Sequence, residues 1–171
     1  MVVPYDAREV ANFFLDYADS REVPLTHLGL QKILYFAHAW YLAKYNVPLI
    51  GHKFEAWEYG PVIRVVFDQL KFLNRRKIDV RLKKIDPFTG APFDAKYDFN
   101  DNTKVFLKNI FDYYGRIDPR ALVDLTHEAG GAWEKVWKST SQRSVVGMYI
   151  PDEAIKLWIL RDGGREGMIR H

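Results

Sequence analysis

The side chains that could carry out acid–base or metal chemistry are few and widely spaced. The chain has five histidines, His27, His38, His52, His127 and His171, and no cysteine. No two histidines show the H-E-x-x-H spacing of a helical zinc site, and without cysteine a zinc site would also require carboxylates. We therefore expect no metal and no cofactor. The absence of cysteine also excludes disulfide and thiolate chemistry.

Two local pairs could support acid–base catalysis. His127 is followed by Glu128, and Glu55 and Glu58 lie near Tyr59. Neither pair forms a known catalytic motif, and the chain has no G-x-S-x-G, P-loop or dinucleotide fingerprint. Exposed loops carry such carboxylates routinely, and a histidine at a helix end commonly bonds to backbone. We therefore expect no enzymatic activity, and an enzyme built around His127 remains one alternative.

The densest run of charge lies between residues 75 and 84. Its basic members are Arg75, Arg76, Lys77, Arg81, Lys83 and Lys84. Such a run could contact nucleic-acid phosphates, meet an acidic partner protein or form a solvated edge that blunts aggregation. The whole chain has a formal charge of +3, below that of a dedicated nucleic-acid binder. We therefore do not expect nucleic acid to be the main partner.

Aromatic residues are abundant, with ten Tyr, eleven Phe and five Trp. Aromatic side chains that carry a polar group are enriched at protein interfaces. Trp57 and Tyr59 stand beside a Gly-Pro pair, where they could lie in the core or on the surface. The composition alone favours core packing for each aromatic residue taken singly.

Most of the chain shows apolar residues at helical spacing. Helices are predicted over about residues 6–19, 26–45, 61–73, 101–114, 118–126, a short segment with Trp133 and Trp137, and a segment from 151. Residues 54–59 alternate between apolar and polar side chains, which predicts a short strand. The pattern of residues 75–100 predicts an irregular arm or small hairpin. The predicted fold is mainly α: a compact single-domain helical bundle with a small irregular or β-hairpin insertion.

Length and hydrophobicity indicate a single domain that spans residues 1–171. The second helix is predicted to be central, with Leu30, Ile33, Leu34, Ala37 and Leu42 in the core. No signal peptide is evident, and no apolar run approaches the roughly 20 residues that span a membrane. We therefore expect a cytoplasmic protein without a membrane partner.

Three segments, in order, resemble the Panacea domain family. They are Leu-Gln-Lys-Ile-Leu-Tyr-Phe-Ala-His-Ala-Trp-Tyr-Leu at 30–42, Phe-Glu-Ala-Trp-Glu-Tyr-Gly-Pro-Val at 54–62, and Leu-Thr-His-Glu at 125–128 followed by Trp133. The order and spacing match over about residues 6–160. This family includes SocA-like antitoxins and phage-associated GepA-like proteins.

The resemblance implies an antitoxin that neutralises a cognate toxin by direct protein–protein binding. Because some family members hand a toxin to a protease, an adaptor for a cellular protease is one alternative. A DNA-binding regulator that uses residues 75–84 is another, although no helix pair here looks like a helix-turn-helix. The family supplies no catalytic residues, and self-association stays open.

Two of these signature segments are poorly explained by helix packing, because both lie where helices begin or end. We therefore expect partner contacts at Trp57, Tyr59, His127 and Trp133, since Tyr and Trp give a large contact area for little lost side-chain freedom. The basic residues Arg75, Arg76 and Lys77 are expected to attract an acidic partner.

Overall fold

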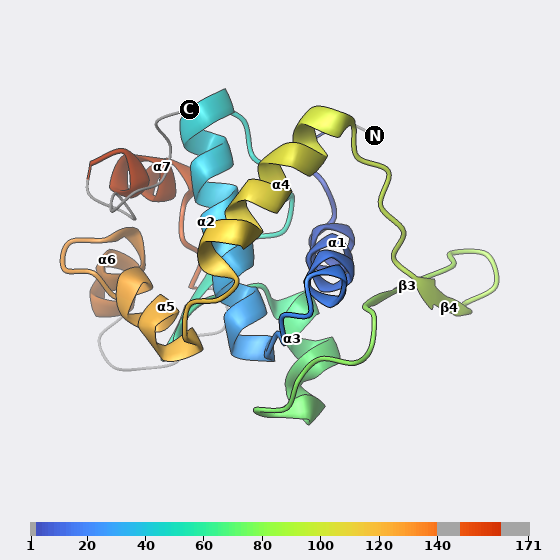
Figure 1. Cartoon of the computed structure of the whole chain (residues 1–171). Helices are drawn as coiled ribbons and strands as arrows, with labels where there is room; N and C mark the ends of the chain where they lie inside the picture. The colour runs from blue at the N-terminus through green and yellow to red at the C-terminus, as the bar shows by residue number, and fades with distance from the viewer. Residues whose placement is uncertain (1–2, 140–147, 162–171) are drawn as a thin grey trace.

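The computed structural model describes residues 3–139 and 148–161. Within these ranges the chain forms seven α-helices, one short 3-10 helix and two antiparallel hairpins (Figure 1). In chain order they are α1 (Ala7–Ser20), α2 (His27–Tyr45), β1 (Glu55–Trp57), β2 (Gly60–Val62), α3 (Arg64–Leu70), η1 (Lys71–Leu73), β3 (Lys83–Ile85), β4 (Pro92–Asp94), α4 (Asp101–Tyr114), α5 (Pro119–Thr126), α6 (Ala132–Ser139) and α7 (Asp152–Arg161). The mainly α prediction is confirmed, with two small hairpins in place of one.

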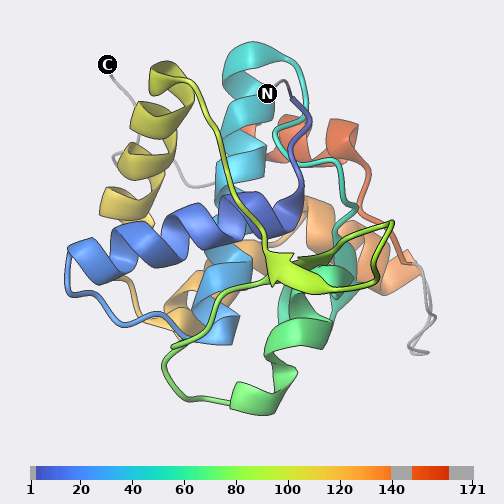
Figure 2. The ribbon, with the colours of Figure 1, turned by 90° about the vertical axis from the view of Figure 1, so that its right-hand side faces the viewer.

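Helix α2 is the centre of the fold. It packs against α1, α4, α5, α7 and β2, and Figures 1 and 2 show α1 crossing it while α4 runs alongside. Thr26 caps its N-terminus by accepting a hydrogen bond from the backbone of Gly29, and Asn46 ends it in the left-handed conformation. The predicted core residues Leu30, Ile33, Leu34, Ala37 and Leu42 are all buried.

Truncating the centre of α2 should test this packing directly. Leu34 is completely buried, so Leu34→Ala should lower the free energy of unfolding by about 2–5 kcal/mol through lost burial and a residual cavity. Urea denaturation measures the change. Leu157→Ala is the control, because Leu157 is half exposed on α7. A loss below roughly 0.5 kcal/mol at Leu34 would contradict this arrangement.

The third helix begins later than the sequence predicts. Pro61 was expected to open it, but Pro61 lies in β2, where it pairs with Ala56 across the hairpin, and α3 starts at Arg64. The cause is Gly60, whose φ of +98° reverses the chain and returns it alongside β1. Strand pairing therefore takes the place of the expected first helical turn.

The first helix shows a smaller difference. Asp6 caps α1 by accepting a hydrogen bond from the backbone N–H of Arg8. Glu9 stands at the third helical position, where the sequence predicts a capping box, but its carboxylate accepts a hydrogen bond from Lys84 Nζ at 2.7 Å. A tertiary contact with a residue far along the chain replaces the local one.

The predicted arm at residues 75–100 contains the β3–β4 hairpin, which projects from the helical body at the right of Figure 1. The side chain of Asn12 holds its base, since Nδ2 donates to the carbonyls of Leu82 and Ala95 while Oδ1 accepts from the backbone N–H of Leu82. Phe88 at the tip is 95% exposed.

The C-terminal part agrees with the sequence interpretation where the structure describes it. Trp133 and Trp137 stack along α6 with ring centroids 5.4 Å apart, and Ile155, Trp158 and Ile159 of α7 are buried. The sequence predicts a loop at 138–147 and a frayed tail at 165–171. The first segment lies largely, and the second entirely, outside the described residues. A search of the described helices found none long and apolar enough to cross a membrane.

Candidate protein-binding surface

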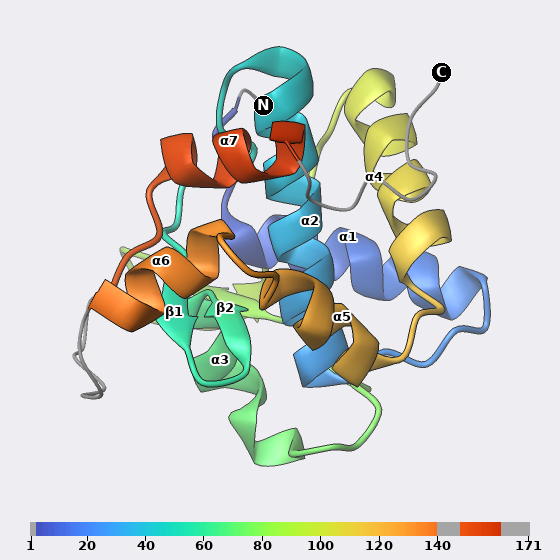
Figure 3. The ribbon, with the colours of Figure 1, turned by 90° about the vertical axis from the view of Figure 1, so that its left-hand side faces the viewer.

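The three signature segments meet at one place in the fold. Residues 30–42 lie on α2, residues 54–62 include the β1–β2 hairpin, and residues 125–133 run from the end of α5 into α6. Figure 3 shows the hairpin between α6 and α3, with α5 beside it. Helix α2 contacts both β2 and α5, and α6 contacts β1. The segments therefore form one continuous structure.

Lys32 lies at the centre of this junction and is completely buried. Its Nζ donates a hydrogen bond to the carbonyl oxygen of Pro61 at 2.8 Å. A Cβ atom added to Gly60 would lie 2.6 Å from Thr126 Oγ1 and 2.9 Å from Lys32 Cε. The hairpin, α2 and α5 thus approach one another so closely that only glycine fits at position 60.

Burial lowers the pKa of Lys32 from 10.5 to about 7. The unfolded chain therefore holds this proton at pH values where the native state has released it, so a rise from pH 7 to 10 favours the native state. We expect the free energy of unfolding of the unmodified protein to increase over this range relative to that of Lys32→Met. Urea denaturation at several pH values tests this, and parallel curves would mean that native Lys32 keeps its proton.

Gln31, next to Lys32, fixes the chain that leaves the hairpin. Its Oε1 accepts from the backbone N–H of Ile63 at 2.9 Å, and its Nε2 donates to the carbonyl of Ile63 at 3.2 Å. Its Nε2 also lies 3.3 Å from Nε2 of His27. Burial, with a smaller effect of the charge on Lys32, lowers the pKa of His27 to about 4. His27 is therefore neutral near pH 7 and accepts this hydrogen bond.

His127 and Trp133 form a stacked pair on the α5–α6 side. Their rings are 3.7 Å apart and nearly parallel, and Trp133 Nε1 donates to the carbonyl of Trp57 at 2.8 Å. Trp133 is 6% exposed, and His127 is half-buried. Trp133 therefore belongs to the core and holds β1 through this hydrogen bond, whereas the His127 ring covers the ring of Trp133.

His127 does not pair with Glu128 in the described structure. The Glu128 carboxylate accepts a hydrogen bond from Trp158 Nε1 on α7 at 2.7 Å. His127 Nε2 is buried and has no hydrogen-bond partner among the described residues. Burial first, and the charge on Lys32 second, lower the pKa of His127. The arrangement is a neutral stacked imidazole rather than an acid–base pair.

Trp57 is held at the edge of the hairpin. Its Nε1 donates to the buried carboxylate of Glu55 at 3.0 Å, and Arg64 pairs with the same carboxylate at 2.9 Å. The Arg64 guanidinium lies 5.3 Å from the centroid of the indole ring, and Phe67 packs edge-on against that ring. Trp57 is half-buried as a result, while Tyr59 in the adjoining turn is 63% exposed.

The basic residues Arg75, Arg76 and Lys77 follow η1 and are all exposed. Arg76 donates to nearby backbone carbonyls, and Lys77 lies 3.6 Å from Asp19. The rest of the basic run is also paired with carboxylates: Arg81 with Asp16 and Asp19, Lys83 with Asp94, and Lys84 with Glu9. Arg75 and Lys77 line a separate groove at the N-terminal end of α2.

The residues that the sequence interpretation missed are Gln31, Lys32 and Gly60. Two polar residues in the widest apolar stripe of the chain were the available signal, because buried polar groups require partners. Gly60 stands before a proline, so its sequence context indicates only a helix boundary. No group of three or more His, Asp or Glu side chains in the described ranges is placed to hold a metal ion.

Comparison with known proteins identifies the class. Residues 30–134 match the family described as "Antitoxin SocA-like, Panacea domain". The chain therefore belongs to this family, as the three segments predicted. The curated protein Antitoxin SocA of Caulobacter vibrioides (strain NA1000 / CB15N) is 32% identical over 151 residues, which cover 88% of this chain and 80% of that protein. No solved structure gives a significant match.

Proposed function

We propose that this protein is an antitoxin that neutralises a cognate toxin by binding it directly, with the β1–β2 turn and the adjoining His127 in the contact surface. Family membership supports the antitoxin role. The observation that favours this surface is the contrast between Tyr59, which is 63% exposed, and its neighbours Gly60 and Pro61, which are buried.

Such a turn is well suited to binding another protein. The buried contacts of Lys32 and Trp133 hold the hairpin in one position, so little conformational freedom is lost when a partner binds Tyr59. A tyrosine ring combines a large apolar area with one hydroxyl group, a combination enriched among residues that dominate binding energy. The exposed carboxylate of Glu58 adjoins it and can add charge selectivity.

The DNA-binding alternative gains less support from the geometry. Of the six basic residues between 75 and 84, Lys77, Arg81, Lys83 and Lys84 lie next to carboxylates. These pairs reduce the positive charge available to phosphates, which supplies most of the affinity of nonspecific nucleic-acid binding.

Co-expression tests the proposal. The chain is produced together with the product of a neighbouring reading frame that is toxic when expressed alone, and growth and co-purification are measured. Direct neutralisation predicts rescue of growth, a stoichiometric complex and an unchanged amount of toxin on immunoblots. Rescue with loss of the toxin would favour the protease-adaptor alternative, and failure to rescue would contradict an antitoxin role toward that product.

A further inference from the structure

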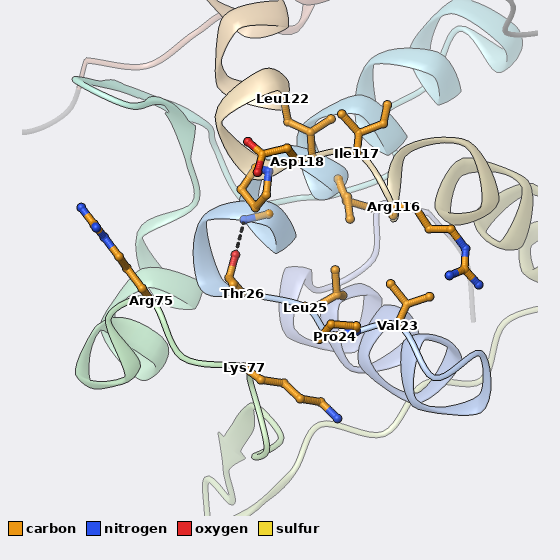
Figure 4. Close-up of a pocket in the computed structure, with 14 residues that line it drawn as sticks. Val23, Pro24, Leu25, Thr26, Arg75, Lys77, Arg116, Ile117, Asp118 and Leu122 are labelled. Carbon is orange, nitrogen blue, oxygen red and sulfur yellow. Dashed lines mark hydrogen bonds between the residues drawn. The ribbon is translucent and has the colours of Figure 1, made fainter.

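A groove with a volume of about 560 Å³ opens at the N-terminal ends of α2 and α5 (Figure 4). Its floor is mainly apolar and is formed by Val23, Leu25, Ile33, Ile117, Pro119 and Leu122. These residues come from the α1–α2 connection, α2, the α4–α5 connection and α5. The volume lies within the range of about 300–1,000 Å³ that is typical of ligand sites.

The rim of this groove is basic. Figure 4 shows Arg75 and Arg116 on opposite sides, with Lys77 between them at the lower edge. Arg75 and Arg116 are exposed, and neither has an ion pair or side-chain hydrogen bond within the part of the chain that the structure describes. The two guanidinium groups are therefore available to an anionic partner on either side of an apolar floor.

The carboxylates near the rim pair with neither Arg75 nor Arg116 in the described structure. Lys77 lies 3.6 Å from Asp19, which also pairs with Arg81. Asp118 is the single carboxylate among the lining residues, and its Oδ1 accepts the backbone N–H of Arg120 as the cap of α5. The N-terminal ends of α2 and α5 add positive potential from their peptide dipoles.

We propose that this groove binds an extended segment of a partner protein in which an apolar residue is flanked on both sides by Asp or Glu. The apolar side chain enters between Leu25, Ile117 and Leu122, and the flanking carboxylates pair with Arg75 and Arg116. An apolar floor favours a peptide over a nucleic-acid strand, whose phosphates need a continuous row of cations. The groove is distinct from the Tyr59 turn, and its binding can be tested without a toxin.

Fluorescence anisotropy with the purified full-length chain tests this inference. The probes are short fluorescein-labelled peptides with a central Leu, Ile or Phe and Asp or Glu on both sides, with matched peptides in which Asn or Gln replaces each acid. We expect the best acidic peptide to bind about tenfold more tightly than its amide counterpart, and its affinity to fall as salt rises. Equal affinities for the acidic and amide sets would overturn the proposal.

Variants locate the binding to the groove. The double variant Arg75→Glu/Arg116→Glu should weaken binding of the acidic peptide about tenfold, because the attraction between the arginines and the peptide carboxylates becomes a repulsion between carboxylates. Lys96→Glu is the matched control, since Lys96 is exposed in the segment between β4 and α4, and it should leave the affinity unchanged. Ile117→Ser should weaken the acidic and amide peptides alike, by removing part of the floor.

Two further results would contradict this inference. Unchanged affinity in the double variant, with its melting temperature intact, would place the peptide elsewhere on the protein. A labelled single-stranded oligonucleotide that binds more tightly than every peptide, and loses affinity in the double variant, would make the groove a nucleic-acid site. Because both arginines are exposed and unpaired in the described structure, the double variant is expected to fold; Arg75→Gln/Arg116→Gln provides a milder second variant.

Discussion

Replacing Tyr59 by alanine is expected to abolish toxin neutralisation while leaving the fold intact. The ring is 63% exposed, although Gly60 and Pro61 directly after it are buried, so loss of the ring should change the free energy of unfolding by less than about 0.5 kcal/mol. If the ring enters a pocket on the toxin, the loss of binding should reach about 2 kcal/mol, or ~30-fold in Kd. Growth rescue, calorimetric binding and thermal melting measure the two effects separately.

Phe88→Ala is the matched control for this variant. Phe88 is also an exposed aromatic residue, but it lies at the tip of the β3–β4 hairpin. Phe88→Ala should rescue growth like the unmodified chain. If Tyr59→Ala rescues growth and Phe88→Ala does not, the projecting hairpin is the contact surface and the assignment to the β1–β2 turn is wrong.

His127→Ala is a less direct test of the same surface. His127 is half-buried and stacks on Trp133, so its removal should cost both stability and partner contact. Loss of rescue in this variant is informative only if the melting temperature is retained. A variant that unfolds would indicate that His127 mainly covers Trp133.

Gly60→Ala should be among the most destabilising single substitutions in the chain. A Cβ atom would lie 2.6 Å from Thr126 Oγ1 and 2.9 Å from Lys32 Cε, on a backbone with φ of +98°. Backbone strain and overpacking together should cost about 3–4 kcal/mol. For a chain of this size, this corresponds to a fall of roughly 10 °C in the melting temperature, which calorimetry can measure.

Gly90→Ala distinguishes the free-energy cost of backbone strain from the cost of overpacking. Gly90 also has a positive φ, of +71°, but a Cβ atom there meets nothing within 4 Å. The destabilisation caused by Gly60→Ala should exceed that of Gly90→Ala by about 2 kcal/mol. Equal losses would mean that α2, the hairpin and α5 do not approach as closely as described.

Thr126 offers a second check on the same contact. Thr126→Ala removes the oxygen closest to the added Cβ but also the hydrogen bond from Thr126 Oγ1 to the carbonyl of Val123. The combined variant Gly60→Ala/Thr126→Ala should therefore be less destabilised than the sum of the single variants, by about 1 kcal/mol. Strict additivity would show that Thr126 does not limit the space at position 60.

The helices follow from local sequence because their causes are local. Asp6, Thr26 and Asp118 cap the helices that follow them, and the nearly continuous apolar sequence of α2 is typical of a helix that is buried on all sides. Helix α4 begins and ends where the sequence predicts, at Asp101 and Tyr114. The family was also evident from the sequence, because the order and spacing of three short segments are sequence properties.

The candidate surface was only partly predictable. Trp57, Tyr59, His127 and Trp133 were selected from the sequence, and the structure places Trp133 and His127 in a stack whose indole N–H bonds to the Trp57 carbonyl. These side chains differ in their exposure to solvent, because Tyr59 is exposed and Trp133 is buried. The composition of a segment does not determine this difference, because the same aromatic residue can fill a core or face solvent.

The tertiary structure alone decided the remaining features. Pro61 belongs to a strand because β1 and Lys32 are present to pair with it. The groove has a basic rim because the fold brings Arg75 and Arg116, distant in sequence, to opposite sides of it. Helix caps and periodicity depend on residues within a few positions of one another. A buried lysine, a crowded glycine and a basic rim instead depend on contacts between segments that are far apart in the chain, and local patterns do not specify the partners in such contacts.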